Sequence, residues 1–301
     1  MLQIWLTMAA LLASAGATDD PTPPRWGAAG HEMAARTATG ALPDDMPAFF
    51  RTAADQLVYL NPEPDRWRNF QLREMDQAWS YDHYIDLENI PNGALDAPDR
   101  FNFLKALYDA ELEKPERDGG FLPYRIIEVY QRIVTEWRMW RSESDLQKKQ
   151  WIEARILNDA GVLGHYVTDA SQPHHTTIHF NGWSAGAPNP EGYSDDRSFH
   201  SRFESAFVEA HVTQADVDAA ARRGSPPSVA GAARAAVWAY IEESHSHVGE
   251  LYRLDRDIGF DPDAALKAET RDFAAGRLAA GADMLAKLWW SAWLESETGP
   301  S

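Results

Sequence analysis

Residues 123–169 read PYRIIEVYQRIVTEWRMWRSESDLQKKQWIEARILNDAGVLGHYVTD, and this stretch decides the fold class. After Pro123, apolar residues recur with the 3.6-residue period of an amphipathic helix as far as about Trp140. A second periodic run begins near Ser144 and continues to about Asp169. No run of alternating apolar and polar residues is long enough to predict a strand. We therefore predict an all-α protein.

Further helices are predicted on both sides of this stretch from apolar periodicity and from boundary residues such as proline, aspartate and glycine. They cover residues 26–40, 44–60, 199–211, 229–252 and 264–294. Two segments are predicted as loops because proline and glycine recur in them. These are residues 61–92, an ordered loop with a helical turn or two, and residues 175–198.

Composition limits the classes of function that the chain can have. Its 301 residues carry 46 acidic and 28 basic side chains, a net charge of −18. This excess argues against a protein that binds duplex DNA by neutralising many phosphates. It does not exclude an enzyme acting on a phosphodiester, because bound metal cations supply positive charge locally. The chain has no cysteine, so only histidine, aspartate and glutamate remain as strong metal ligands.

The first residues predict an exported protein, periplasmic or secreted. An apolar run from Leu2 to Leu12 is followed by Ala-Gly-Ala, which resembles the cleavage site of a signal peptide. A buried first helix is the alternative, because the run carries no lysine or arginine. We divide the chain into a signal peptide (1–17), a Pro-rich linker (18–25), one domain (26–295) and a tail (296–301). No other segment approaches the ~20 apolar residues of a membrane span, and no protein partner is predicted.

The strongest candidates for metal ligands lie where the second long helix ends, in the run HYVTDASQPHH at residues 165–175. His165 and Asp169 are four residues apart and therefore share one helix face. The following proline turns the chain, which brings His174 or His175 back toward the same point. Imidazole and carboxylate groups in this arrangement suit zinc. Taken alone, the same pair could be a surface ion pair contributing a few tenths of a kcal/mol.

Three further pieces carry the same residue types. His200 and Glu204 repeat the four-residue spacing on another predicted helix. His83 lies in the run DHYID, and His31 closes the run WGAAGH. Each piece is weak by itself, but together they predict a cluster of histidines and carboxylates drawn from four places in the chain.

The run at residues 165–175 resembles the H-Y-x-G/T-D-x-x-x-P-x-H signature of bacterial zinc-dependent phospholipases C. It equally resembles the H-x-x-x-D-x-x-Q-P-L-H core of fungal and plant single-strand-specific nucleases, which share the same fold. The resemblance extends from Trp26 to the last helix, and nine positions match the metal ligands of this superfamily in order. They are Trp26, His31, Asp65, His83, His165, Asp169, His175, His200 and Glu204.

This resemblance implies a zinc-dependent phosphodiester hydrolase with a zinc cluster in a cleft of a single multi-helix domain. One zinc would be held by Asp65, His83, His165 and Asp169. A second would be held by His175, His200 and Glu204. A third would be held by His31, Asp169 and the backbone of Trp26, so that Asp169 is a bridge. Two such metals, ~3.5–4 Å apart, can share a hydroxide nucleophile. The implied catalytic residues are Asp65, Asp169 and Arg68, with Arg68 binding the phosphate.

The sequence departs from the family pattern in three ways. Residues 18–25 precede Trp26, which is the mature amino terminus in the family, so we expect two zincs, and three only if processing exposes Trp26. The G-G-N run of the nucleases is absent after the core motif. His174 stands where the nucleases have leucine, which leaves open whether His174 or His175 is the ligand. In the loop that follows, His179, Phe180 and Trp183 are predicted substrate contacts.

The substrate stays open between a single-stranded nucleic acid and a phospholipid head group. The His-x3-Glu spacing that ends at Glu204 favours the phospholipase branch, whereas the WGxxGH run and the Asp65–Arg68 segment favour the nuclease branch. Two other classes are alternatives to an enzyme. One is a non-catalytic exported zinc-binding helical protein, and the other is a metal-free helical domain with coincidental histidines.

Overall fold

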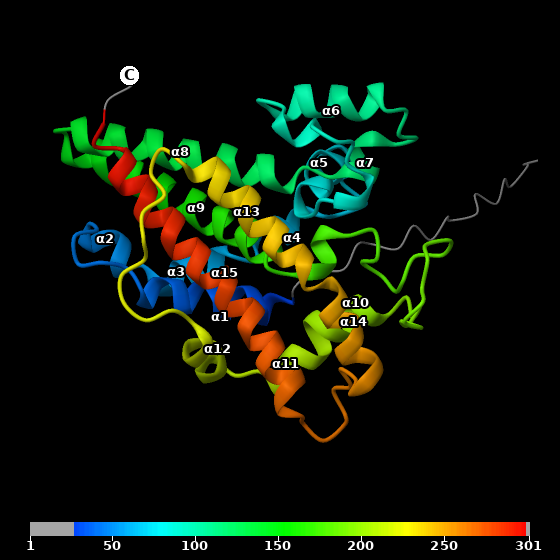
Figure 1. Cartoon of the computed structure of the whole chain (residues 1–301). Coiled ribbons are helices and arrows are strands. Elements are labelled where there is room, and N and C mark those ends of the chain that lie inside the picture. The colour runs from blue at the N-terminus through cyan, green and yellow to red at the C-terminus, as the bar shows by residue number, and fades with distance from the viewer. Residues whose placement is uncertain (1–26, 299–301) are drawn as a thin grey trace, which may run out of the picture.

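A computed structural model describes residues 27–298 of the chain (Figure 1). The described residues are mostly helical and contain no β-strand, which confirms the all-α prediction. Several predictions lie outside the described residues: the signal peptide (1–17), the linker (18–25), Trp26 and the end of the tail (299–301). None of the described helices combines the length and the apolar character needed to cross a membrane.

Four long helices form the framework. Helices α8 (Leu122–Ser142) and α9 (Leu146–Asp169) form a hairpin, and α15 (Ala268–Glu295) crosses both of them. Figure 1 shows α15 running diagonally over this pair, with α1 (Ala28–Gly40) packed beside it. Asp145 caps α9 by accepting hydrogen bonds from two backbone amides of its first turn. The two predicted long helices are thus confirmed to within a few residues.

The other helical segments surround this framework. They are α2 (Ala48–Arg51), α3 (Ala54–Leu60), α4 (Glu63–Trp67), α5 (Arg73–Trp79), α6 (Arg100–Asp109), α7 (Pro115–Gly119), α10 (Phe199–Ser201), α11 (Val208–His211), α12 (Gln214–Ala220), α13 (Ala233–Ser246) and α14 (Val248–Asp257), with a π-helical segment, η5 (Arg202–Phe207), between α10 and α11. Short 3₁₀ turns are η1 (Ser80–His83), η2 (Leu87–Asn89), η3 (Ala94–Asp96) and η4 (Pro173–Thr176).

Three predicted segments are corrected by the structure. The helix predicted at residues 44–60 begins later, at Ala48, because Pro47 cannot lie inside a helix and instead precedes α2. It is also interrupted at residues 52–53, which separate α2 from α3. The loop predicted at residues 61–92 contains more helix than expected, since Pro64 occupies the first turn of α4, where proline is favourable. The helix predicted at residues 229–252 is divided at His247 into α13 and α14.

Two clusters of buried side chains hold these helices together. The larger one surrounds Trp137 and Trp289, which are fully buried. The smaller one is rich in phenylalanine and joins the α10–η5 segment to α14 and to the first half of α15. The C-terminal end of α9 and the turn η4 lie near both clusters, and this is where the predicted ligands meet.

Candidate metal centre

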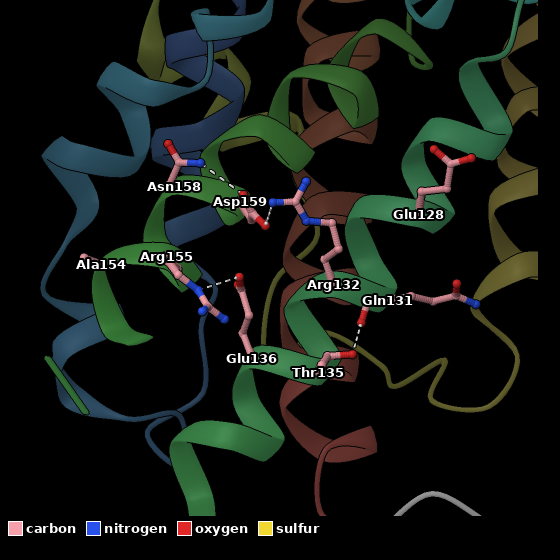
Figure 2. A pocket seen from close by; sticks show the side chains of 9 residues that line it. All are labelled: Glu128, Gln131, Arg132, Thr135, Glu136, Ala154, Arg155, Asn158 and Asp159. Atoms are coloured by element: carbon pink, nitrogen blue, oxygen red, sulfur yellow. Dashed lines mark hydrogen bonds and ion pairs between the residues drawn. The ribbon is translucent and has the colours of Figure 1, made fainter. Parts of the chain in front are cut away.

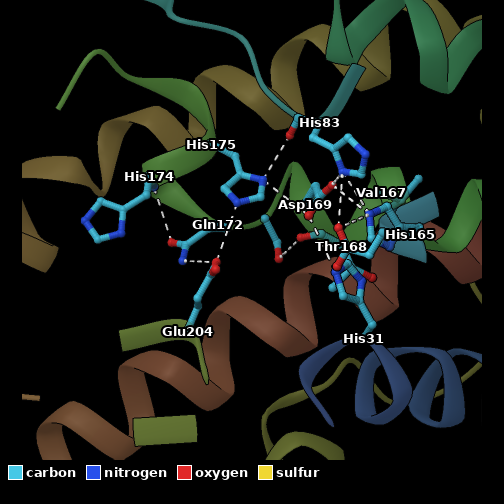
Figure 3. Close-up of polar contacts among 12 residues, drawn as sticks. His31, His83, His165, Val167, Thr168, Asp169, Gln172, His174, His175 and Glu204 are labelled. Carbon is cyan, nitrogen blue, oxygen red and sulfur yellow. Dashed lines mark hydrogen bonds and ion pairs between the residues drawn. The ribbon is translucent and has the colours of Figure 1, made fainter. Parts of the chain in front are cut away.

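The predicted ligands form one buried cluster, although they come from separate segments of the chain (Figure 3). Its eight described members are all buried. They are His31 on α1, Asp65 on α4, His83 on η1, His165 and Asp169 on α9, His175 on η4, His200 on α10 and Glu204 on η5. Trp26, the ninth predicted ligand, lies outside the described residues.

The first group of donor atoms surrounds one point between α4, η1 and α9. His165 Nε2 lies 3.0 Å from His83 Nδ1 and 3.2 Å from Asp169 Oδ2. Asp65 Oδ1 completes the group at 3.8 Å from His165 Nε2 and 3.9 Å from His83 Nδ1. Donors bound at 2.0–2.1 Å around a tetrahedral zinc ion are about 3.3 Å apart. Asp65, His83 and His165 are therefore close enough to hold one ion, and Asp169 lies next to both histidines.

The second group lies on the other side of Asp169. His175 Nε2 is 3.2 Å from His200 Nε2 and 3.5 Å from Glu204 Oε2, and the last two atoms are 2.8 Å apart. These three atoms are spaced like one face of a tetrahedron of the same size, so the group could hold a metal ion.

A third group consists of His31, His165 and Asp169. His31 Nε2 lies 3.5 Å from Asp169 Oδ1, whereas the other oxygen of Asp169 faces the first group. The rings of His31 and His165 are stacked with their centroids 4.0 Å apart. Asp169 therefore faces two groups at once, as the bridging role requires.

The structure distinguishes His175 from its neighbour. His175 belongs to the second group, whereas His174 is not part of it. The ring of His174 packs instead among those of Phe199, Phe203 and Tyr252, next to the ring of His200. Figure 3 shows the two imidazoles on opposite sides of the turn.

In His31, His165 and His175, a hydrogen bond to the other ring nitrogen fixes which atom of the ring faces the cluster. Nδ1 of His165 donates to the Asn61 carbonyl (3.0 Å), and Nδ1 of His175 donates to the His83 carbonyl (2.9 Å). Nδ1 of His31 donates to Oδ1 of Asn61 at 3.0 Å. In a neutral ring each Nε2 then directs a lone pair at a carboxylate oxygen, which is repulsive unless a cation lies between them. Metal-binding histidines use their second nitrogen in this way, so the residues present fit a metal ion.

Burial and neighbouring charges shift the pKa values of the side chains in the cluster. Burial lowers the pKa of His31, His83 and His200 well below the ordinary value, so these rings are neutral at pH 7. Burial alone would raise the pKa of Asp169, but adjacent histidines hold that pKa well below its usual range. At His175 the carboxylates of Asp169 and Glu204 outweigh burial and raise the pKa to about 10. A cation at this position is therefore strongly favoured, whether it is a proton or a metal ion.

Asn61 is a site residue that the sequence did not single out. Its carbonyl and its side chain accept hydrogen bonds from two different ligand histidines. Gly161 and Gly164 allow this close approach, because a Cβ at these positions would overlap Leu60 and the Asn61 amide respectively. The only signal in the sequence is a pair of glycines on one face of α9, with Gly161 one turn before His165 and Gly164 directly before it.

A cleft of about 480 Å³ lies against the cluster and is lined by His83, His175 and His200. Arg68 also lines it, with Nη1 3.8 Å from Asp65 Oδ1. Of the three predicted substrate contacts, Phe180 lines the cleft. His179 and Trp183 do not line it; their rings stack on each other at 3.7 Å, and Trp183 packs against Tyr252. Substrate contact by these three side chains stays a prediction.

A second hollow, of about 820 Å³, lies between α8 and α9 (Figure 2). Its floor carries the buried acids Glu136 and Asp159, which form ion pairs with Arg155 and Arg132. No histidine lines it, so it is separate from the candidate metal centre.

Comparison with protein-family models, curated proteins and solved structures gives no match. The class that the fold and the site define is therefore a mostly helical protein with buried groups of histidine, aspartate and glutamate that could hold metal ions.

Proposed function

We propose that the chain is a zinc-dependent hydrolase of phosphodiesters. One observation carries the proposal: three groups of buried donor atoms lie around Asp169, beside a cleft. The donors are nitrogen and oxygen atoms without thiolates, a set that suits zinc at the distances described above.

The residues around the cleft have separate roles in this proposal. Zinc, when bound, would supply a Lewis acid and lower the pKa of water. Asp65 and Asp169 place carboxyl groups at the cluster, and Asp169 lies between its groups. Arg68 is placed to bind a phosphate oxygen next to these ligands, because a guanidinium offers paired hydrogen bonds to phosphate. The net charge of −18 would otherwise repel such a substrate.

Export and the third zinc are part of the proposal and depend on residues 1–26. Mass spectrometry of the protein recovered from expressing cells would identify its first residue. We expect three zincs per chain if Trp26 is that residue, and two zincs otherwise. A chain recovered with its full amino terminus intact would contradict export.

The direct test combines metal analysis with hydrolysis of a small diester, bis(p-nitrophenyl) phosphate. We expect about two or three zincs per chain, activity that a chelator removes, and recovery when zinc is added back. Asp169→Asn should lower activity by more than about 100-fold, beyond the effect of losing a residue that only orients a ligand. Asp159→Asn is the matched control, since Asp159 is buried on the same helix outside the cluster.

Two negative results would point to two different alternatives. Bound zinc without hydrolysis of any diester would favour the non-catalytic zinc-binding protein. A chain that binds no zinc, and whose stability a chelator does not change, would end the metal hypothesis.

A further inference from the structure

Phe70 is a large apolar residue in an unusual position. Its side chain is 83% exposed, yet it lines the same cleft as His83 and His200. The turn that carries it is ordered, because Gln71 N donates to Asn69 Oδ1 at 3.0 Å and Leu72 N donates to the Asn69 carbonyl at 2.8 Å. The ring is therefore held at the rim of the cleft without being used to pack the core.

Arg197 reaches the same cleft from the loop before α10. It is exposed, and it forms no ion pair with any residue between 27 and 298. Arg36 and Arg256, which are also exposed, are by contrast paired with acids of this chain. In a chain with an excess of acids, an arginine without an acidic partner at the mouth of a cleft is available to an external anion.

We propose that Phe70 and Arg197 bind the strand of a single-stranded nucleic acid beside the reacting phosphate. The ring of Phe70 stacks on an unpaired base, and the guanidinium of Arg197 binds a neighbouring phosphate. A groove that combines aromatic rings with cations binds single strands in this way, without sequence preference. The inference rests on the proposed function, whose substrate class it names.

A lipid surface fits the rim less well. Insertion into a bilayer requires several exposed apolar residues around the mouth. Among the large exposed hydrophobic residues that the structure describes, Phe70 lines the cleft, whereas Leu72 and the others do not. The arginine beside it is better suited to a phosphate backbone.

The test measures binding, so it does not depend on turnover. The zinc-loaded full chain is titrated into a fluorescein-labelled phosphorothioate oligothymidine, which resists cleavage, and anisotropy is recorded. Phe70→Ala should weaken binding by about 10-fold, as expected for the loss of one stacked base. The matched control is Phe101→Ala, because Phe101 is 76% exposed and lies outside the cleft.

Arg197→Gln should lower the slope of log affinity against log salt concentration by about 0.7, which corresponds to one lost phosphate contact. Arg223→Gln, exposed and outside the cleft, should leave the slope unchanged. Zinc content and thermal melting show whether each variant is folded.

Two results would overturn the inference: Phe70→Ala binding the oligonucleotide as tightly as the wild type, or a wild type that binds phosphatidylcholine vesicles but not the oligonucleotide. Failure of the wild type to hydrolyse bis(p-nitrophenyl) phosphate would instead contradict the proposed function, while oligonucleotide binding would still test the inference.

Discussion

Gln172 shows how single residues around the cluster support its ligands. Its Nε2 donates to Glu204 Oε2 at 3.3 Å, and its Oε1 accepts from the His174 amide. We predict that Gln172→Ala lowers zinc affinity by about 10- to 100-fold, because Glu204 loses the partner that orients it. Competition with a chromophoric chelator measures the change. Gln150→Ala, exposed on α9, should bind zinc as the wild type does, and equal affinities in both variants would refute the role of Gln172.

Among single residues, the candidate ligands were easier to predict from the sequence than the residues that orient them. His165, Asp169, His200 and Glu204 were visible because a four-residue spacing places two side chains on one helix face. The amide partners Asn61 and Gln172 were not predicted as partners, because their roles depend on contacts between segments distant in the chain.

At the scale of helices, the contact between α3 and α9 decides where Asn61 lies. We predict that Gly161→Ala destabilises the protein by about 1–3 kcal/mol, because its Cβ would overlap Leu60 in a packed interface. Gly276→Ala on α15 meets no atom within 4 Å and should stabilise the protein by up to about 1 kcal/mol. Urea unfolding measures both. Equal effects of the two substitutions would show that the α3–α9 contact is looser than described.

The interface between α8 and α9 makes stability depend on pH. Burial, together with Asp159, raises the pKa of Glu136 from 4.5 to about 7. The native state therefore binds an extra proton between these values, and the free energy of unfolding falls as pH rises through this window. We predict that Glu136→Gln matches the wild type at pH 4 and becomes relatively more stable up to about pH 7. A difference independent of pH, measured by urea unfolding, would contradict this.

Helices were predictable where apolar periodicity runs unbroken, as in α8 and α9. They were less predictable where short helices begin at prolines, as at Pro47 and Pro64, because proline signals both a helix start and a loop.

At the scale of the whole molecule, the fold brings together ligands that lie as far apart in sequence as His31 and Glu204. Helical periodicity predicted the fold class but not which helices meet, since that depends on packing such as α15 across α9. The described part of the chain thus places eight predicted ligands in one cluster. Trp26 stays a prediction.

Anomalous diffraction at the zinc absorption edge would show directly whether this cluster binds zinc. We predict one strong peak among Asp65, His83, His165 and Asp169, and another among His175, His200 and Glu204. A third peak beside His31 is expected only if the mature chain begins at Trp26. Crystals grown with zinc that show no peak at the first two positions would contradict zinc binding by the cluster.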